Sequence, residues 1–224
     1  PTNAKYVRFH NSTNEVNVIS AKLITRSIES KNGDLPTLIR FGQAWVSGEV
    51  QQDYTRCLLE VLDMNTSELT SCHSMFRYCT NLTSINCNWN TSNVTNMGAM
   101  FSNCNNLTQL DVSNFDTSNV TNMYCMFYNC TNLTQLDVSN FDTSNATSIS
   151  YMFYGCNNLT QLDVSNFDTS NVNNMRSMFS YCNNLTQLDL SNFDTRQVTD
   201  MYGMFNSCNN LTDRKSTRLN SSHQ

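Results

Sequence analysis

The sequence has few of the residues on which most enzymes and membrane proteins depend. Only six of its 224 residues are glycine, and none lies in a glycine-rich loop of the kind that cradles phosphate. Of its three histidines, His10 and His73 lie outside the C-terminal tail, and neither is in a nucleophile or metal motif. The sequence contains no run of 18 apolar residues, so it predicts no transmembrane helix. These absences predict a protein that is not an enzyme and has no cofactor or dedicated metal site.

The strongest signal in the sequence is an internal repeat. The stretch 106–130 returns almost verbatim after it, and successive anchoring cysteines lie 25, 26, 26, 26 and 26 residues apart. A fixed period in this range is typical of solenoids, in which each unit stacks on the next. The anchoring cysteines are Cys79, Cys104, Cys130, Cys156, Cys182 and Cys208.

Each repeat contains two segments of different hydrophobic period. Leu110 and Val112 alternate with polar residues, which predicts a short strand with one buried face. Over 123–130, apolar residues recur at i, i+3, i+4 and i+7, which predicts a short helix capped by Thr121 or Asn122.

One repeat cannot fold alone, because so short a helix is unstable in water. The polar stretch 116–119 predicts the turn between strand and helix. The apolar side chains of one repeat are covered only when the next repeat stacks on them, with equivalent strands about 4.8 Å apart. The predicted inward set of one repeat is Leu107, Leu110, Val112, Phe115, Val120, Met123, Met126, Phe127 and Cys130.

The pattern L-x-x-L-x-V…M-x-x-M-F-x-x-C resembles the BspA-like leucine-rich repeats, a 26-residue class found in bacterial surface proteins and lipoproteins. The resemblance covers about Cys57 to Thr212. It implies a leucine-rich-repeat solenoid displayed outside the cell and used to attach to host proteins or other cells. One departure is that Phe115 occupies the position of the usual ladder asparagine, while Asn114 precedes it.

We therefore expect an α/β repeat solenoid of the leucine-rich-repeat type, with one short parallel strand and one short helix per unit. Residues 56–212 form the solenoid, with a degenerate first unit (56–79) and a truncated last one. The second unit is one residue short around Trp89, where we expect a tightened turn.

The non-repeating residues 1–55 are interpreted as a β-rich N-terminal cap, with a separate small β domain as the alternative. Three stretches within them read as short strands, at Tyr6–Phe9, Val16–Ile19 and Leu38–Phe41.

Both ends of the chain look artificial. The chain opens at Pro1 rather than methionine, which we interpret as an internal cut, so the missing signal peptide is uninformative. Asp213–His223 resembles a sequencing adapter translated in one frame; a natural basic tail is the alternative. We therefore treat residues 213–224 as a non-native tail.

The repeats are acidic. Over 79–212, nine aspartates stand against Arg176 and Arg196, a net charge of −7. Such a surface repels phosphate backbones and anionic lipid, so neither nucleic acid nor a membrane surface is expected as a partner.

The cysteines are predicted to be buried, structural thiols rather than disulfides. Side chains at equivalent positions of neighbouring repeats point the same way, whereas a disulfide needs them to face each other. Cys72 and Cys87 align with core positions, while Cys57 and Cys125 are less constrained.

The first candidate binding surface is the strand face, where a Gln, an Asp and a Ser recur in each repeat. Its aspartates should raise one another's pKa, because they lie one strand spacing apart. This column could also bind calcium weakly, since calcium prefers oxygen ligands. The residues are Gln109, Asp111, Ser113, Gln135, Asp137, Ser139, Gln161, Asp163, Ser165, Gln187, Asp189 and Ser191.

The second candidate surface is the outer side of the predicted helices, where the repeats differ from one another and favour tyrosine. Tyrosine is enriched in recognition surfaces, although these rings could simply cover the gaps between helices. The residues are Tyr124, Tyr128, Tyr151, Tyr154, Tyr181 and Tyr202.

We expect a bacterial surface module that binds an extracellular protein or glycan through one of these faces. The alternative is a structural spacer that projects another domain from the cell surface. A secreted enzyme whose catalytic part lies elsewhere in the full protein stays open.

Overall fold

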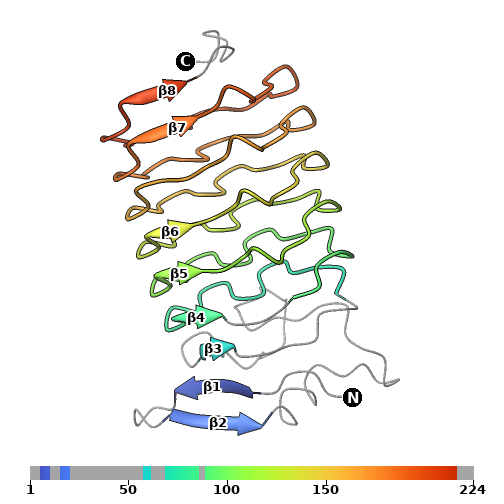
Figure 1. Cartoon of the computed structure of the whole chain (residues 1–224), viewed down its shortest axis with the longest axis vertical. Coiled ribbons are helices and arrows are strands. Elements are labelled where there is room, and N and C mark those ends of the chain that lie inside the picture. Colours follow the sequence, from blue (N-terminus) through green and yellow to red (C-terminus); the bar gives the residue numbers. More distant parts are fainter. Residues whose placement is uncertain (1–5, 11–15, 21–57, 62–68, 86–88, 216–224) are drawn as a thin grey trace, which may run out of the picture.

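The computed structural model describes residues 6–10, 16–20, 58–61, 69–85 and 89–215. Successive repeats form coils that lie one above another in an elongated stack (Figure 1). Parallel bridges between equivalent positions of adjacent coils run unbroken along it, through Ser71, Asn96, Asn122, Ser148, Asn174 and Asp200.

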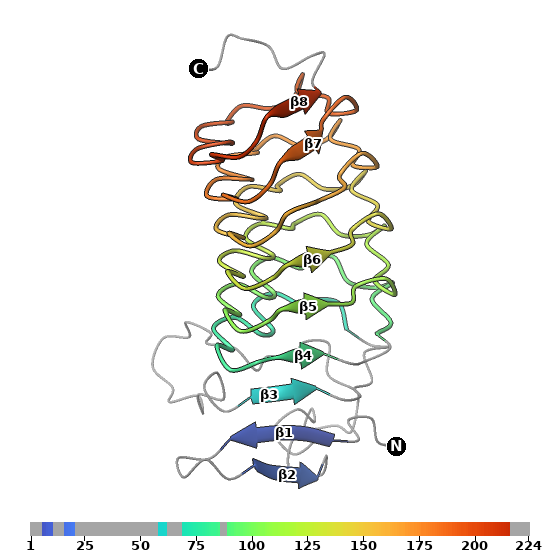
Figure 2. The ribbon, with the colours of Figure 1, turned by 60° about the vertical axis from the view of Figure 1, so that its left-hand side comes forward.

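Short strands line one side of the stack (Figure 2). β5 pairs with β6 and β7 with β8, both in parallel, and Leu110 lies directly opposite Leu136. The alternation of buried and exposed residues predicted for 109–113 is confirmed. These strands are β4 (Ser84–Ile85), β5 (Gln109–Leu110), β6 (Gln135–Leu136), β7 (Gln187–Asp189) and β8 (Asp213–Lys215).

An antiparallel hairpin lies at the N-terminal end of the stack. β1 (Tyr6–His10) pairs with β2 (Val16–Ser20) and with β3 (Leu58–Val61), and β3 pairs in parallel with β4. The first two predicted strands are thus confirmed, and the third, at 38–41, lies outside the described residues. The hairpin occupies the place expected for a cap, but the assignment of residues 1–55 stays a prediction.

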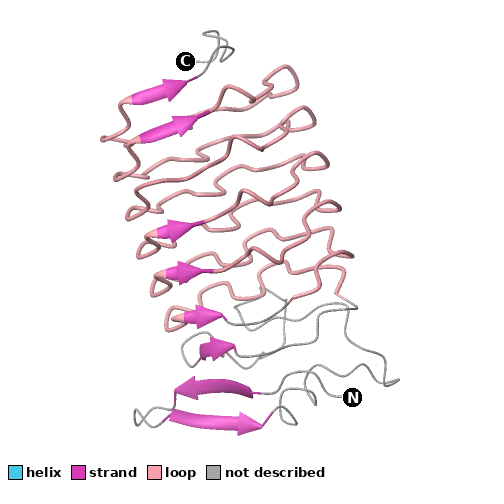
Figure 3. Ribbon diagram, in the orientation of Figure 1, coloured by secondary structure: helices cyan, strands magenta, loops and turns pink. Residues whose placement is uncertain are grey.

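The predicted helices are wrong: none of the described residues is helical, and the stretch 123–130 is a series of turns (Figure 3). Every second backbone N–H, from Met123 to Asn129, donates to a carbonyl of the next coil. Between them, the N–H groups of Met126 and Tyr128 donate three residues back within the same coil. Cys125 and Asn129 have φ values of 55° and 54°, which no α-helix contains.

These left-handed residues recur in each coil, four positions apart within the stretch. One of them is Gly155, with φ of 70°, where an added Cβ would lie 2.1 Å from Oδ1 of Asn129. The predicted cap residue Asn122 caps a turn instead, because its Oδ1 accepts the N–H of Tyr124 at 2.9 Å.

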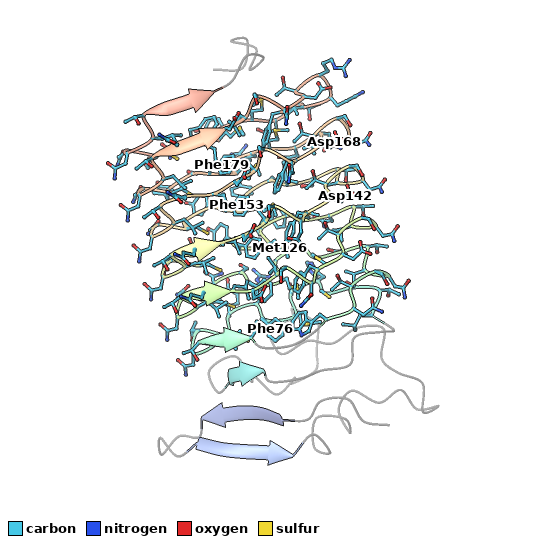
Figure 4. All side chains as sticks on the ribbon, in the orientation of Figure 1. Phe76, Met126, Asp142, Phe153, Asp168 and Phe179 are labelled. Carbon is cyan, nitrogen blue, oxygen red and sulfur yellow. The ribbon has the colours of Figure 1, made fainter. Side chains whose placement is uncertain are left out.

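The predicted inward set is confirmed, since all nine of its side chains are buried. Within the stack, Phe101, Phe127 and Phe153 are stacked nearly parallel, with ring centroids 5.8 and 5.7 Å apart. Figure 4 labels other members of this interior, Met126 and Phe179. Apolar side chains therefore form continuous columns along the stack axis, and each coil covers its neighbour.

Trp89 takes the place of the repeated phenylalanine, as the sequence alignment of the repeats predicts. It is buried and is stacked against Phe115, with ring centroids 5.3 Å apart. Residues 86–88 lie outside the described residues, so the tightened turn expected around Trp89 stays a prediction.

Polar side chains also connect the coils. The hydroxyl of buried Thr117 donates to the carbonyl of Asp142 at 2.9 Å and accepts the Asp142 N–H at 2.8 Å. Asn140 donates to the carbonyls of Val112, Ser113 and Phe115 of the previous coil. The asparagine that precedes the repeated phenylalanine thus bonds from coil to coil.

The described cysteines are free and buried, as predicted. Most anchoring thiols donate to the carbonyl of a phenylalanine in the previous coil, for example Cys130 to Phe101 at 3.2 Å. Cys57 and Cys87 lie outside the described residues. The cysteines described are Cys72, Cys79, Cys104, Cys125, Cys130, Cys156, Cys182 and Cys208.

Among the described residues, there is no helix with the length and apolar character needed to cross a membrane. The first residues of the predicted tail, 213–215, form β8 and continue the strand ladder. The adapter origin of this tail stays an interpretation.

Candidate binding surfaces

The structure aligns the repeated polar residues of the strand face in columns. Gln109 lies opposite Gln135 in register, and the aspartate and serine that follow each glutamine are solvent-exposed or half-buried. The columns arise because strand residues alternate between the core and solvent. The predicted strand-face residues therefore do come together.

The predicted rise of the aspartate pKa values is wrong for Asp111, Asp137 and Asp163, whose pKa values are lowered. The hydroxyl and N–H of Ser165 both donate to Oδ1 of Asp163, at 2.7 and 2.9 Å. These bonds stabilise the carboxylate and lower the pKa of Asp163, and the charges of Asp137 and Asp189 oppose the shift only weakly. Each aspartate is thus bound mainly to its own turn.

A hollow of about 260 Å³ opens on this face between two neighbouring coils. The segment 161–163 is not a strand, so the ladder is interrupted between β6 and β7. The side chains around the hollow are mainly polar, from residues 161–163 and 186–189.

No group of three or more His, Cys, Asp or Glu residues that could hold a metal ion exists within the described coils. The aspartates of the strand face are in a single column, each with its own serine. This geometry provides no multidentate cage for calcium, whose weak binding was expected from the sequence.

The tyrosines form one connected surface on the side of the stack built from the turn segments. Tyr128 and Tyr154 are stacked with ring centroids 4.7 Å apart, and Tyr151 lies 5.9 Å from the ring of Tyr124. Tyr181 continues the surface 5.3 Å beyond Tyr154. We call this surface the tyrosine face, and it brings together residues from coils that are 26 positions apart in sequence.

The tyrosine face ends at a fixed arginine. The guanidinium of Arg176 lies 4.7 Å from the ring centroid of Tyr202 and donates to the hydroxyl of Tyr151 at 2.7 Å. It also pairs with Asp200 at 3.3 Å. The ring of Tyr202 is 70% exposed, so Arg176 supports it while leaving most of it open to solvent.

A second arginine lies at the other end of the face. The guanidinium of Arg77 lies 5.0 Å from the ring centroid of Tyr78. The sequence analysis missed Arg77, Tyr78, Arg176 and Asp200 as members of this surface. The available signal was that the position of Arg176 carries histidine, glycine, tyrosine, serine and tyrosine in the other repeats, whereas the strand-face residues of the regular repeats barely change.

The phenol of Tyr124 is neutral at physiological pH. A hydrogen bond with Cys125, together with partial burial, raises the pKa of Tyr124 to about 12. Burial likewise raises the pKa of Tyr128 and Tyr154. Tyr124, Tyr128 and Tyr154 therefore offer neutral aromatic rings and hydroxyl groups on an acidic body.

Comparison with known proteins gives one family. The description "Mycoplasma protein of unknown function, DUF285" matches residues 49–161 and again residues 130–223. No curated protein and no solved structure matches the chain. The two matches together span most of the chain, including every described coil, and they overlap within the repeats. The chain belongs to the DUF285 family.

Proposed function

We propose that this chain is a leucine-rich-repeat solenoid of the BspA-like type, displayed outside the cell, in which turns replace the usual helices. We further propose that it binds an extracellular protein or glycan and performs no catalysis. The unbroken parallel ladder and the 26-residue columns support a solenoid. The repeat pattern that resembles BspA-like proteins supports the location.

The observation that carries the binding role is the connected tyrosine face. Half-exposed rings of Tyr124 and Tyr181 lie on a backbone in which alternate N–H groups are bonded to the next coil, so the surface is rigid before any partner arrives. A rigid, amphipathic aromatic surface loses little conformational entropy on binding. By contrast, the aspartates and serines of the strand face already bond to each other.

The experiment compares two sets of four substitutions in the complete chain. Tyr124, Tyr128, Tyr151 and Tyr154 are changed to serine in one variant. The matched control changes four exposed strand-face residues, Gln109, Gln135, Gln161 and Gln187, to serine. Binding to purified matrix proteins, to oligosaccharides and to intact cells is then measured for each protein, together with its thermal unfolding.

We expect the tyrosine variant to lose at least tenfold in affinity and the glutamine variant to bind as the parent does. A loss of affinity in the glutamine variant but not in the tyrosine variant would assign the binding role to the strand face and its hollow. A parent protein that binds none of these partners would favour the alternative of a structural spacer.

A further inference from the structure

The tyrosine face already holds arginine side chains of its own chain. Arg77 lies over Tyr78 and Arg176 lies over Tyr202, at 5.0 and 4.7 Å. A guanidinium over a tyrosine ring is attracted by the negative face of the ring. This surface therefore shows directly which chemical group its rings accept.

Two rings of the same face have no such occupant. Tyr124 is 43% exposed and Tyr181 is 40% exposed, and no described guanidinium lies over either ring. The ring of Tyr124 meets that of Tyr151 at an interplanar angle of 81°, and the ring of Tyr181 meets that of Tyr154 at 59°. At such angles the rings do not cover one another face to face, so both can receive a further group.

The charge of the coils selects the same kind of partner. Residues 79–212 carry nine aspartates and two arginines, and both arginines are paired with aspartates, Arg176 with Asp200 and Arg196 with Asp194. The remaining carboxylates attract cations from a distance and repel acidic partners. Asp200 is the one carboxylate among the residues assigned to the tyrosine face, and it is paired with Arg176, so the face adds contacts with rings to this general attraction.

We propose that the tyrosine face binds an arginine-rich, extended segment of an extracellular protein, with guanidinium groups stacked on Tyr124 and Tyr181. This inference rests on the proposed function and names the chemistry of the partner. Arginine is favoured over lysine because its planar, weakly hydrated guanidinium stacks on aromatic faces, whereas ammonium is strongly hydrated. An extended segment suits a surface that crosses several coils.

The test measures the binding of three fluorescent peptides of equal length to the complete chain by anisotropy. The peptides alternate serine with arginine, lysine or glutamate. We expect the arginine peptide to bind several-fold more tightly than the lysine peptide, and the glutamate peptide not to bind. Tyr124→Leu with Tyr181→Leu should weaken the arginine peptide about tenfold and remove its advantage over lysine.

A matched pair of arginine variants gives an independent readout that needs no change of a tyrosine. Arg176→Ala uncovers the ring of Tyr202, while Arg196→Ala removes the same charge from an arginine paired with Asp194. Both variants remove the arginine side chain that pairs with an aspartate. We expect Arg176→Ala to bind the arginine peptide more tightly than the parent, and more tightly than Arg196→Ala.

Equal binding of the arginine and lysine peptides, or equal effects of Arg176→Ala and Arg196→Ala, would show attraction by charge alone and overturn the proposal. The absence of any arginine-peptide binding would also overturn it. In that case the loss of matrix or glycan binding in the four-tyrosine variant would still support the proposed function. The two failures are therefore distinguishable.

Discussion

The Sγ atom of Cys156 donates a hydrogen bond of 3.2 Å to the carbonyl oxygen of Phe127, one coil earlier. The same oxygen also accepts the backbone N–H of Cys130. Cysteine suits this position because it is a small, largely apolar residue with one weak donor. The cysteines whose spacing reveals the repeat thus form a ladder of thiol donors inside the stack.

Replacing Cys156 by alanine should lower the free energy of unfolding by about 1–2 kcal/mol, through the lost sulfur volume and the lost hydrogen bond. Urea unfolding followed by circular dichroism measures this loss. Cys72→Ala is the control, since the Cys72 side chain is also buried but has no thiol bond to a phenylalanine carbonyl. Equal losses in the two variants would argue against a role for the thiol ladder.

The protein should lose stability in alkali. Burial raises the pKa of Cys130 to about 12 from an ordinary value of 9.0. The unfolded chain therefore releases this proton first, and the stabilisation present below pH 9 is lost as the pH rises towards 12. The slope is at most about 1.4 kcal/mol per pH unit for each such thiol.

Urea midpoints measured between pH 8 and pH 11 test this expectation. Cys130→Ala should show a shallower decline than the parent, because it lacks one of the titrating thiols. A decline of the same slope in both proteins would assign the alkaline loss to other groups, such as the tyrosines.

Thr117→Val should lower the stability of the protein by more than the nearly unchanged shape of the side chain suggests. The hydroxyl of buried Thr117 both donates to and accepts from the backbone of Asp142, so valine leaves two part-buried backbone groups without that partner. We expect a loss of about 1–3 kcal/mol in the free energy of unfolding. Thr121→Val is the matched control, because the exposed Thr121 hydroxyl only donates, to Thr95 at 3.2 Å. An equal loss in the free energy of unfolding of Thr121→Val would contradict this account.

Ser165→Ala should raise the pKa of Asp163. The serine hydroxyl is the main cause of the lowered pKa, and the neighbouring charges of Asp137 and Asp189 act in the opposite direction. Carboxyl ¹³C chemical shifts followed through an acid titration measure the change. In the parent, the stabilisation from this carboxylate is present above its unfolded pKa and is lost as the pH falls through the lower folded value. An unchanged pKa in the variant would show that the hydroxyl is not its cause.

The sequence predicted the parts of the fold that depend on period. The 26-residue spacing placed Leu110 opposite Leu136, and all nine side chains that the apolar pattern assigned to the interior of the unit are buried. The candidate tyrosines were also found, because they stand where otherwise identical repeats differ. These features follow from which residues repeat, and a sequence displays that directly.

The stretch 123–130 could not be predicted in the same way. Apolar residues at i, i+3, i+4 and i+7 fit a helix, yet they also fit a series of turns that buries the same side chains. Stacking of the coils favours the turns over the helix, because alternate N–H groups donate to carbonyls of the next coil. Those bonds satisfy the backbone with positive φ values at Cys125 and Asn129, and no local pattern encodes a partner 25 residues away.

The character of the two surfaces was likewise decided by tertiary structure. The sequence placed aspartates in a column, but only the structure shows that each is bound by its own serine more strongly than it is repelled by its neighbours. The sequence named the tyrosines, but only stacking brings Arg176 onto Tyr202 and beneath the hydroxyl of Tyr151. Period is a property of the chain, whereas contact between coils exists only after the coils have stacked.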